Sequence, residues 1–324
     1  MKVFFGILIL IVLVLAVIAE VFFQFVFSRQ GIRIPGKPYL KEGEYDLRSW
    51  KQFEQRHLED VEWLSSQPME EITVVSDDSL NLCGHYFKAE EPKRIVLCVH
   101  GYRGNGMHDF ASVSRFLHEQ NCDLLLIDQR ASGKSEGTYI TFGAKEKQDI
   151  RKWCEYLSDH NPKELPIYLY GISMGCASVL CALDTGVDTI VNGVIADCGF
   201  ASIRSILADR AWKTFHAPAF PVLNLMELYC ILRAGFRFEE GNAEKVLRSA
   251  AVPVLFIHGS EDHFVPVENT IRNYEACASE KELVLVNGGV HASSYNTDET
   301  LYQSKLLSFF ERNDRNHLQE TTAV

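Results

Sequence analysis

Between residues 71 and 310, short and almost wholly apolar segments alternate with longer amphipathic ones. The apolar segments are EITVV, CGHYF, RIVLCVH, DLLLID, PIYLY, IVNGVIA, VPVLFIH and ELVLV. Helical patterns lie near residues 110–119 and 145–157, after Ser173 and Val267, and at 300–310. This alternation predicts an α/β fold with a mostly parallel central sheet flanked by helices. In such sheets the functional crevice lies beyond the carboxyl ends of the strands.

Composition and charge exclude several classes of function. The chain has 324 residues, of which 47% are hydrophobic and 23% are charged, so it can bury one large core. Its formal net charge of -11, without a concentrated basic patch, argues against a nucleic-acid partner. The nine cysteines form no CxxC pair or Cys/His cluster, so we expect no metal site. An odd number of cysteines, some within apolar segments, fits a reducing compartment.

The N-terminus is an apolar run over residues 3–27, interrupted only by Glu20 and Gln24. As a helix, at about 1.5 Å per residue, this run would extend roughly 37 Å, more than the ~30 Å hydrocarbon core of a bilayer. Residues 1–28 are therefore expected to form a single transmembrane anchor. A signal peptide cleaved after Ala19 is an alternative, although it would leave an apolar mature terminus. A buried core helix is a weaker alternative because the run lacks a polar face.

Charges around this run bear on its orientation. Arg29, Arg33, Lys37 and Lys41 follow the run, whereas Lys2 precedes it. The positive-inside rule therefore favours a cytoplasmic main domain, and the opposite orientation stays open.

Residues 29–70 are expected to join the anchor to the main domain. The stretch GIRIPGKPYLKEGEYD is rich in glycine, proline and charge, as linkers are. Residues 45–64 then show apolar side chains at helical spacing, including Trp50 and His57, which predicts a helix that packs on the domain. Residues 71–324 form the expected main domain.

The segment PIYLYGISMGCASVL places Ser173 between an expected strand and an expected helix. A direct reversal from strand to helix strains the backbone of the turn residue, and Gly171 and Gly175 remove the Cβ atoms that would clash. The serine hydroxyl is then held in the open, next to backbone N–H groups and the positive end of the helix dipole. This context favours a nucleophile over a merely structural turn.

A nucleophilic serine needs a base, and the base needs an acid that fixes its tautomer. Asp262 in HGSEDHFVP and His291 in NGGVHASSY each follow an expected strand. They come after Ser173 in the order Ser, Asp, His that this architecture uses. We therefore predict these three residues as the catalytic set.

Other residues compete for these roles. Glu261 lies next to the expected acid, and His263 lies too close to it to be the obvious base. His258 should end a buried strand, where a hydrogen-bonded core histidine is the plainer interpretation. His100 is expected to shape a turn rather than transfer a proton.

The oxyanion that forms during attack on a carbonyl needs two fixed donors. The backbone N–H of Met174, next to the serine, is one candidate, and the N–H of Tyr102 in HGYRGN is the other. The strand that precedes HGYRGN should neighbour the serine strand, which favours this assignment over an ordinary glycine-rich turn.

The segments HGYRGN, DQRASGKSEG, GISMG, IHGSEDHFVP and GGVHASSY together resemble the motif series of α/β-hydrolases. The chain is most similar to membrane-anchored bacterial serine hydrolases that resemble the Bem46-like and prolyl-oligopeptidase-like (S9-like) hydrolases, over residues 71–310. The resemblance implies an α/β-hydrolase fold and serine hydrolase chemistry on esters, thioesters or amides. It also implies the triad Ser173, Asp262 and His291, oxyanion donors at Tyr102 and Met174, and no cofactor.

The chain departs from that pattern at two positions. Ala131 and Ser79 stand where glycine is usual. Both positions lie outside the triad motifs, so we expect these departures to affect the conformation of loops more than the catalytic chemistry. We interpret Asp128, Arg130 and Ser135 in the same region as structural.

Residues 198–251 form a long insertion at the catalytic edge and are expected to act as a helical cap over an apolar acyl pocket. The insertion carries the aromatic residues Trp212, Phe215, Phe220, Tyr229, Phe236 and Phe238 together with His216. For most of them, packing of the cap onto the body is the plainer role.

We therefore expect a carboxylesterase-like serine hydrolase that acts on a small-molecule or lipid-like acyl substrate and needs no cofactor. A serine peptidase or amidase of the same fold is an alternative within enzymes. A catalytically silent, membrane-tethered binding module is the alternative outside them.

Overall fold

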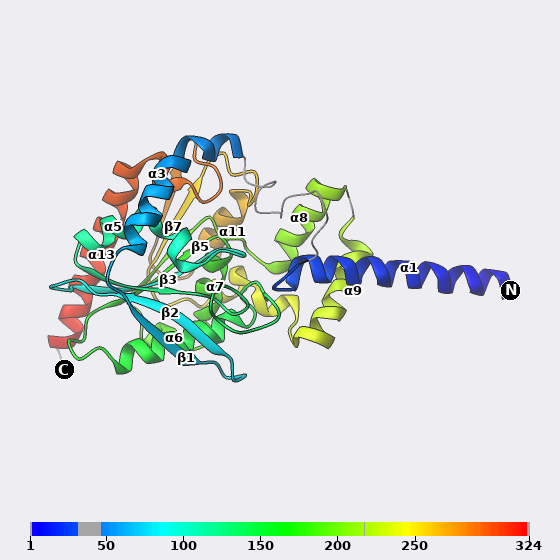
Figure 1. The fold of residues 1–324 in the computed structure, drawn as a ribbon, viewed down its shortest axis with the longest axis horizontal. Helices are drawn as coiled ribbons and strands as arrows, with labels where there is room; N and C mark the ends of the chain where they lie inside the picture. Colours follow the sequence, from blue (N-terminus) through cyan, green and yellow to red (C-terminus); the bar gives the residue numbers. More distant parts are fainter. Residues whose placement is uncertain (1, 32–46, 217, 323–324) are drawn as a thin grey trace.

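The computed structural model describes residues 2–31, 47–216 and 218–322 (Figure 1). Within these residues, the strands form one eight-stranded sheet in the order β1-β2-β4-β3-β5-β6-β7-β8. The pairs β1/β2 and β2/β4 are antiparallel, and the remaining neighbours are parallel. The strands are β1 (Glu70–Val75), β2 (Asn81–Phe87), β3 (Arg94–Val99), β4 (Cys122–Ile127), β5 (Ile167–Ile172), β6 (Gly193–Asp197), β7 (Val254–Gly259) and β8 (Lys281–Val286).

Each of the eight apolar segments of the sequence forms one of these strands. Strands β3 to β7 are buried along their whole length, which is why they contain almost no polar residues. The mostly parallel sheet predicted from the alternation is confirmed.

Helices cover both faces of the sheet (Figure 1). One face packs against α6 (Glu146–Asp159), α7 (Met174–Ala182), α10 (Ala243–Leu247) and α11 (Glu268–Ala276). The other face packs against α3 (Leu47–Ser65), α5 (Ala111–Glu119) and α13 (Glu299–Thr322). The short helices α4 (Gly106–Asp109), η1 (Val187–Thr189) and α12 (Ser294–Thr297) lie in connections. Helix α3 confirms the helix expected at 45–64, whereas most of the expected linker, residues 32–46, lies outside the described residues.

Parallel pairing brings the informative strand ends to one edge. Val99 of β3 pairs with Gly171 of β5, so the HGYRGN loop begins next to the GISMG turn. The expectation that these two strands are neighbours is confirmed. His258 of β7 pairs with Leu285 of β8, so the loops after those two strands also begin side by side.

A third apolar cluster lies beyond this edge, where α1 (Lys2–Phe27) meets the insertion (Figure 1). Between β6 and β7 the insertion forms α8 (Ile203–Phe215), α9 (Ala219–Tyr229), η2 (Cys230–Ala234) and η3 (Phe238–Gly241) before α10. Helix α10 belongs to the body because Ala243 and Leu247 are buried against α7 and the sheet. The cap itself is therefore formed mainly by α8 and α9.

An anchor formed by residues 1–28 stays a prediction, but α1 is not wholly separate from the rest of the protein. Ala19, Phe23 and Phe27 are fully buried in the third cluster, and Glu20 forms an ion pair with Arg233 of η2. The apolar run thus has two parts in different surroundings, because its last third packs inside the protein and only the earlier residues extend away from it. In the part of the chain that the structure describes, no helix combines the length and the apolar character needed to cross a membrane.

The first two thirds of α1 project away from the rest of the molecule (Figure 1). Large apolar side chains are exposed along this part, and they are Phe4, Phe5, Ile7, Ile9, Leu10, Leu13, Val14, Val17 and Ile18.

The two departures from the expected glycine pattern both adopt left-handed backbone conformations. Ser79 has a φ of 66° and Ala131 a φ of 58°, the region that glycine favours. Nearby, the Asp128 carboxylate accepts a hydrogen bond from the N–H of Lys134, and the Ser135 hydroxyl donates to the carbonyl of Asp128. These contacts agree with a structural role for this loop.

Arg130 supports the same loop from inside. Its guanidinium donates to both carboxylate oxygens of Asp149 and to Asp78, and burial leaves it almost no exposed surface. Burial raises the pKa of the Asp149 carboxyl to about 6, although Arg130 opposes this effect.

Candidate active site

Ser173 lies between β5 and α7 with a φ of 56° and a ψ of -116°. A Cβ atom on Gly175 would come within 1.9 Å of the Val99 carbonyl oxygen, and one on Gly171 within 2.4 Å of the Gly175 oxygen. Only glycine therefore allows α7 to start so close to the sheet. The strained turn expected from GISMG is present, and it holds the serine at the first turn of α7.

The three side chains expected to form a catalytic set lie in one hydrogen-bonded line. The Ser173 hydroxyl lies 2.9 Å from Nε2 of His291, and Nδ1 of His291 lies 2.7 Å from Oδ2 of Asp262. A carboxylate accepts hydrogen bonds, so Nδ1 carries the proton and Nε2 is left to accept from the serine. All three residues are buried.

The Asp262 carboxylate is fixed by four donors. Oδ1 accepts the backbone N–H groups of Phe264 and Val265, both at 2.9 Å. Oδ2 faces His291 and also Nε2 of His258 at 3.1 Å. Burial on its own raises the pKa of Asp262, but the two histidines outweigh burial and hold this pKa well below its usual value. The carboxylate is therefore ionised at neutral pH.

His258 is a buried histidine of β7, as its strand position predicted. Its Nε2–H is shared between the carbonyl of Val265 at 2.9 Å and Oδ2 of Asp262 at 3.1 Å, so Nδ1 accepts from the Thr270 hydroxyl at 2.7 Å. The contact of His258 with Asp262 was not expected, and it restrains the same carboxylate oxygen that faces His291.

The other rival residues do not reach the serine. The side chains of Glu261 and His263 are 60% and 85% exposed and lie 3.9 Å from each other. Nε2 of His100 accepts the N–H of Gln129, so Nδ1 donates to the Gly101 carbonyl at 2.7 Å. His100 thus shapes its turn, in agreement with the interpretation from the sequence.

The HGYRGN loop passes directly against the serine. A Cβ atom on Gly101 would lie 3.3 Å from Cβ of Ser173, and Tyr102 follows Gly101 and lines the same pocket. Met174 is the first residue of α7, a position where the N–H has no acceptor within the helix. The structure therefore gathers both expected oxyanion donors around Ser173.

Two supporting residues were missed by the sequence reasoning. Asp109 of α4 accepts the N–H of Gly101 at 2.8 Å, which fixes the start of the HGYRGN loop. The Trp50 indole N–H of α3 donates to the carbonyl of His291 at 3.0 Å and ties the histidine loop to a residue 241 positions away in the sequence. The helical spacing of Trp50 showed only that it would pack, and no sequence signal marked Asp109.

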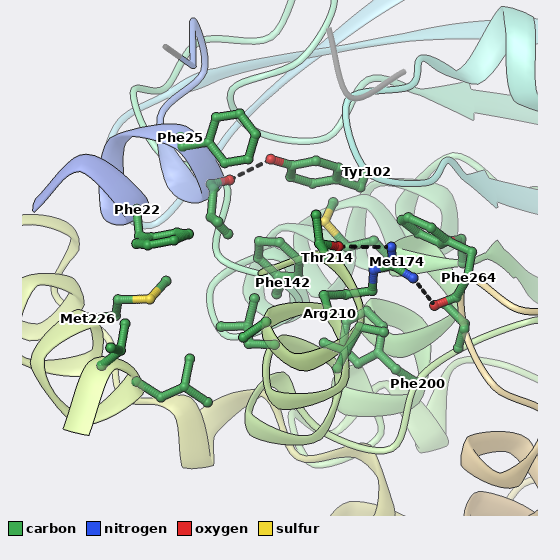
Figure 2. A pocket seen from close by; sticks show the side chains of 18 residues that line it. Phe22, Phe25, Tyr102, Phe142, Met174, Phe200, Arg210, Thr214, Met226 and Phe264 are labelled. Atoms are coloured by element: carbon green, nitrogen blue, oxygen red, sulfur yellow. Dashed lines mark hydrogen bonds between the residues drawn. The ribbon is translucent and has the colours of Figure 1, made fainter. Parts of the chain in front are cut away.

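A cavity of about 880 Å³, counting the part open to solvent, lies next to Ser173 (Figure 2). Its walls are mostly apolar and come from α1, from the two cap helices and from the body. Helix α1 contributes Phe22, Phe25 and Val26, α8 contributes Ile206, Leu207, Arg210, Ala211 and Thr214, and α9 contributes Val222, Leu223 and Met226. The body contributes Tyr102, Phe142, Ser173, Met174, Phe200, Phe264 and Val265.

Arg210 is the charged residue of this wall. Its guanidinium donates to the Thr214 hydroxyl and to the Phe264 carbonyl and lies 4.6 Å from the centre of the Phe264 ring (Figure 2). The Phe264 ring and the two hydrogen-bond acceptors hold the charged guanidinium of Arg210 against the wall of the pocket.

Of the insertion aromatics named from the sequence, none whose side chain the structure describes lines the pocket. Phe236 and Phe238 are buried, in agreement with a packing role, whereas Trp212 and Phe220 are 60% and 75% exposed. The aromatic side chains of the pocket come instead from α1, from the body and from Phe200 at the start of the insertion, whereas α8 and α9 supply mainly aliphatic ones. The pocket is thus enclosed in part by α1, a segment that the sequence had led us to assign to an anchor.

Among the described residues, potential metal ligands gather at Cys198, Asp262 and His291. Two of these belong to the hydrogen-bonded line at Ser173. Burial raises the pKa of the Cys198 thiol well above its usual value, so it is a protonated thiol and a poor ligand. The donor set fits proton transfer better than metal binding.

The chain is similar to several known proteins. A model of the family described as serine aminopeptidase, S33, matches residues 90–229, which include the HGYRGN loop and Ser173. YqkD of Bacillus subtilis is 30% identical over 227 residues, or 70% of this chain and 74% of YqkD. Bem46 of Schizosaccharomyces pombe is 25% identical over 198 residues, or 60% of each chain. The esterase Pf2001 of Pyrococcus furiosus shares the fold, with a TM-score of 0.63 at 23% identity over 78% of this chain and 95% of that chain.

Proposed function

This chain belongs to the α/β-hydrolase superfamily, and we propose that it is a serine hydrolase that cleaves a carboxylic ester or thioester. The observation that carries the proposal is the line from the Ser173 hydroxyl through His291 to the ionised Asp262. An unpaired serine would be a poor nucleophile, whereas this line supplies a base in the correct tautomer.

The first step is acylation of the serine. Nε2 of His291 takes the hydroxyl proton while the Ser173 oxygen attacks the carbonyl carbon, and Asp262 stabilises the resulting imidazolium. The backbone N–H groups of Tyr102 and Met174 receive the oxyanion. His291 then gives the proton to the leaving alcohol or thiol, which departs and leaves an acyl-serine.

The second step is hydrolysis of the acyl-serine. His291 removes a proton from water, the hydroxide oxygen attacks the acyl carbon, and the same two N–H groups hold the second oxyanion. The bond to Ser173 breaks, the serine oxygen regains the proton from His291, and a carboxylic acid leaves. No redox change occurs, and the balance requires only water.

The pocket favours an apolar acyl group over an aminoacyl group. An aminopeptidase has to accommodate the positive α-ammonium of its substrate, which an acidic side chain would favour. Among the described pocket residues the charged one is Arg210, which would repel an ammonium, and the others are mainly apolar. A peptidase or amidase is therefore the second candidate, supported by the description of the matching family.

We extend the proposal to membrane association through the exposed part of α1. A helix that exposes Phe5, Leu10, Leu13 and Val14 to solvent leaves a large apolar surface uncovered. Flotation of the full chain with phosphatidylcholine vesicles tests this, and we expect the protein to float. Replacement of Leu10, Leu13 and Val14 by lysine should leave it in the soluble fraction, and flotation of that variant would contradict the role of α1.

Labelling with a fluorophosphonate probe tests the chemistry. Ser173→Ala should abolish labelling and reduce hydrolysis of a p-nitrophenyl ester by about 10⁶-fold. Ser249→Ala, at an exposed serine just after the end of α10, should label as the unchanged protein does. Labelling that persists in Ser173→Ala would identify another nucleophile, and an unchanged protein that does not label would indicate a silent binding module.

A further inference from the structure

The wall of the pocket opposite the triad comes from the last turns of α1. Phe22, Phe25 and Val26 face the cavity that Ser173 also lines (Figure 2). On the other side of the same turns, Phe23 and Phe27 are fully buried. The wall is therefore built from one stretch of helix with a substrate face and an anchoring face.

The anchoring face packs onto both the cap and the body. The Phe27 ring lies 5.4 Å from Phe142 and 5.7 Å from Phe236, and the Phe23 ring lies 5.2 Å from Tyr139. Aromatic pairs at such distances stabilise the folded state by more than the burial of their apolar surface alone. These contacts fix the rotation of the helix, so the residues that face the cavity have defined positions.

The chain that follows α1 is held to the body as well. The carbonyl of Phe27 accepts the N–H of Ile140 at 2.8 Å, and the N–H of Arg29 donates to the carbonyl of Thr138 at 2.8 Å. The Arg29 side chain donates to the carbonyls of Gly133 and Ser135. The end of the helix and the residues after it are thus fixed against the folded domain.

The carbonyl groups at the end of α1 also hold the HGYRGN loop. The Tyr102 hydroxyl donates to the carbonyl of Val26 at 2.6 Å (Figure 2). Nη2 of Arg103 donates to the carbonyls of Phe25 and Ser28, each at 2.9 Å. Carbonyls at a helix C-terminus lack intrahelical partners and carry the negative end of the dipole, so an arginine is a favourable partner.

We propose that residues 22–28 are a positioning and specificity element of the active site. Their backbone carbonyls hold Tyr102 and Arg103 so that the N–H of Tyr102 points at the oxyanion, and the side chains of Phe22, Phe25 and Val26 limit the length and width of the acyl chain. The inference rests on the proposed serine hydrolase function and deepens it. Residues 1–28 are then not a separable anchor, because their last turns complete the catalytic site.

The positioning role is tested with Tyr102→Phe in the full-length protein. This change keeps the ring and the backbone N–H and removes only the hydroxyl that reaches Val26. We expect kcat to fall about 5-fold to 10-fold for acetyl and decanoyl esters alike, with KM within 2-fold, because one hydrogen bond is lost. Tyr139→Phe makes the same change in the same aromatic cluster and should leave both constants unaltered. An unchanged kcat in Tyr102→Phe would overturn the positioning role.

The specificity role is tested through side chains that leave the carbonyls in place. Phe25→Ala should move the preferred acyl chain to a longer one, with kcat/KM for a hexadecanoyl ester at least 5-fold higher relative to acetyl. Val26→Phe should narrow the pocket and lower kcat/KM for a decanoyl ester at least 10-fold while the acetyl ester stays within 2-fold. Phe5→Ala, on the exposed part of the same helix, is the matched control. An identical chain-length profile in all four proteins would overturn the specificity role.

A series of fluorophosphonates with methyl, octyl and hexadecyl chains separates this inference from the proposed function. Its labelling rates report the chain-length profile at the serine without a natural substrate. If the unchanged protein labels at Ser173 and Phe25→Ala, Val26→Phe and Tyr102→Phe all label at its rates, the inference fails and the function stands. If the protein does not label, or labels in Ser173→Ala, the proposed function fails first.

Discussion

The two sides of the pocket are built in different ways. On the sheet side, Ser173, Asp262 and His291 follow β5, β7 and β8, and hydrogen bonds from buried neighbours fix each of them. On the opposite side, the side chains of α1, α8 and α9 that enclose the cavity are mostly apolar and pack against one another. The first side is defined by directional bonds and the second by shape.

This difference has a consequence for substitutions. Directional hydrogen bonds in a buried network tolerate little change, because an unpaired polar group is left behind. Apolar packing tolerates exchanges of similar volume and responds to larger ones by a change of shape. We expect changes on the sheet side to alter the rate for every substrate and changes on the helix side to alter the choice among substrates.

The largest effect is expected on the sheet side, from Asp262→Asn. An amide in this position can no longer hold His291 in the tautomer that accepts from the serine, so kcat should fall by about 10⁴-fold. The loss should be equal for acetyl and decanoyl esters in steady-state assays. A loss confined to the longer ester would show that the two sides of the pocket are not functionally separate.

The pH dependence of stability probes the same side. Asp197 ends β6, and its carboxylate accepts from the Tyr302 hydroxyl at 2.7 Å. Burial raises the pKa of Asp197 to about 6. The folded state therefore binds more protons than the unfolded state between pH 4 and 6, and stability falls as the pH rises through this window.

Asp197→Asn removes this titration. Between pH 4 and 7 the unchanged protein should lose roughly 3 kcal/mol of unfolding free energy relative to the variant, from a shift of about two pKa units. Urea unfolding at a series of pH values measures the difference. A difference that stays constant with pH would show that Asp197 titrates normally in the folded state.

On the helix side, Val222→Trp is expected to act on selectivity. Val222 of α9 lines the cavity and is half-buried, so a larger side chain can occupy the space without disturbing the sheet. We expect kcat/KM for a decanoyl ester to fall about 10-fold to 30-fold, since apolar contacts of one or two methylene groups have such values. The acetyl ester should change less than 2-fold. Leu228→Trp, at an exposed position on the same helix, serves as the control. Equal losses of kcat/KM for the two esters in Val222→Trp would contradict the separation between a rate-determining sheet side and a selective helix side.

The smallest effect is expected from Ala131→Gly. Ala131 has a φ of 58°, and relief of this strain should stabilise the protein by about 1 kcal/mol with activity unchanged. Ala208→Gly within α8 makes the same exchange in a helix and should destabilise by about 1 kcal/mol. Thermal unfolding of the two variants should therefore shift in opposite directions. Shifts of the same sign would mean that the loop after β4 carries no such strain.

The sheet side could be predicted from the sequence because its signals are local. Each strand is a short apolar run, and each functional side chain follows a strand within a few residues, as Ser173 and His291 do. The rule that parallel strands end at one edge then brings distant motifs together without knowledge of their contacts. The glycines around Ser173 marked the turn for the same local reason.

The helix side could not be predicted in this way. The run of residues 3–27 has a uniform apolar character, and nothing in it distinguishes Phe5, which is exposed, from Phe23, which is buried. An apolar residue packs equally well on lipid, on a cap or on substrate. Composition alone therefore could not predict which of these each residue contacts. The same holds for the cap, where Trp212 is exposed although aromatic character had predicted packing.

The order of strands and helices, the turn at Ser173 and the candidate acid and base follow from residue patterns, because backbone geometry and side-chain chemistry act over a few neighbouring residues. The partners of α1, the supports given by Trp50 and Asp109, and the shape of the acyl pocket follow from the folded chain alone. Apolar burial has no preferred direction, so an apolar face is stabilised by any surface that fits it closely. Which surface it covers therefore depends on how all the helices and strands pack together.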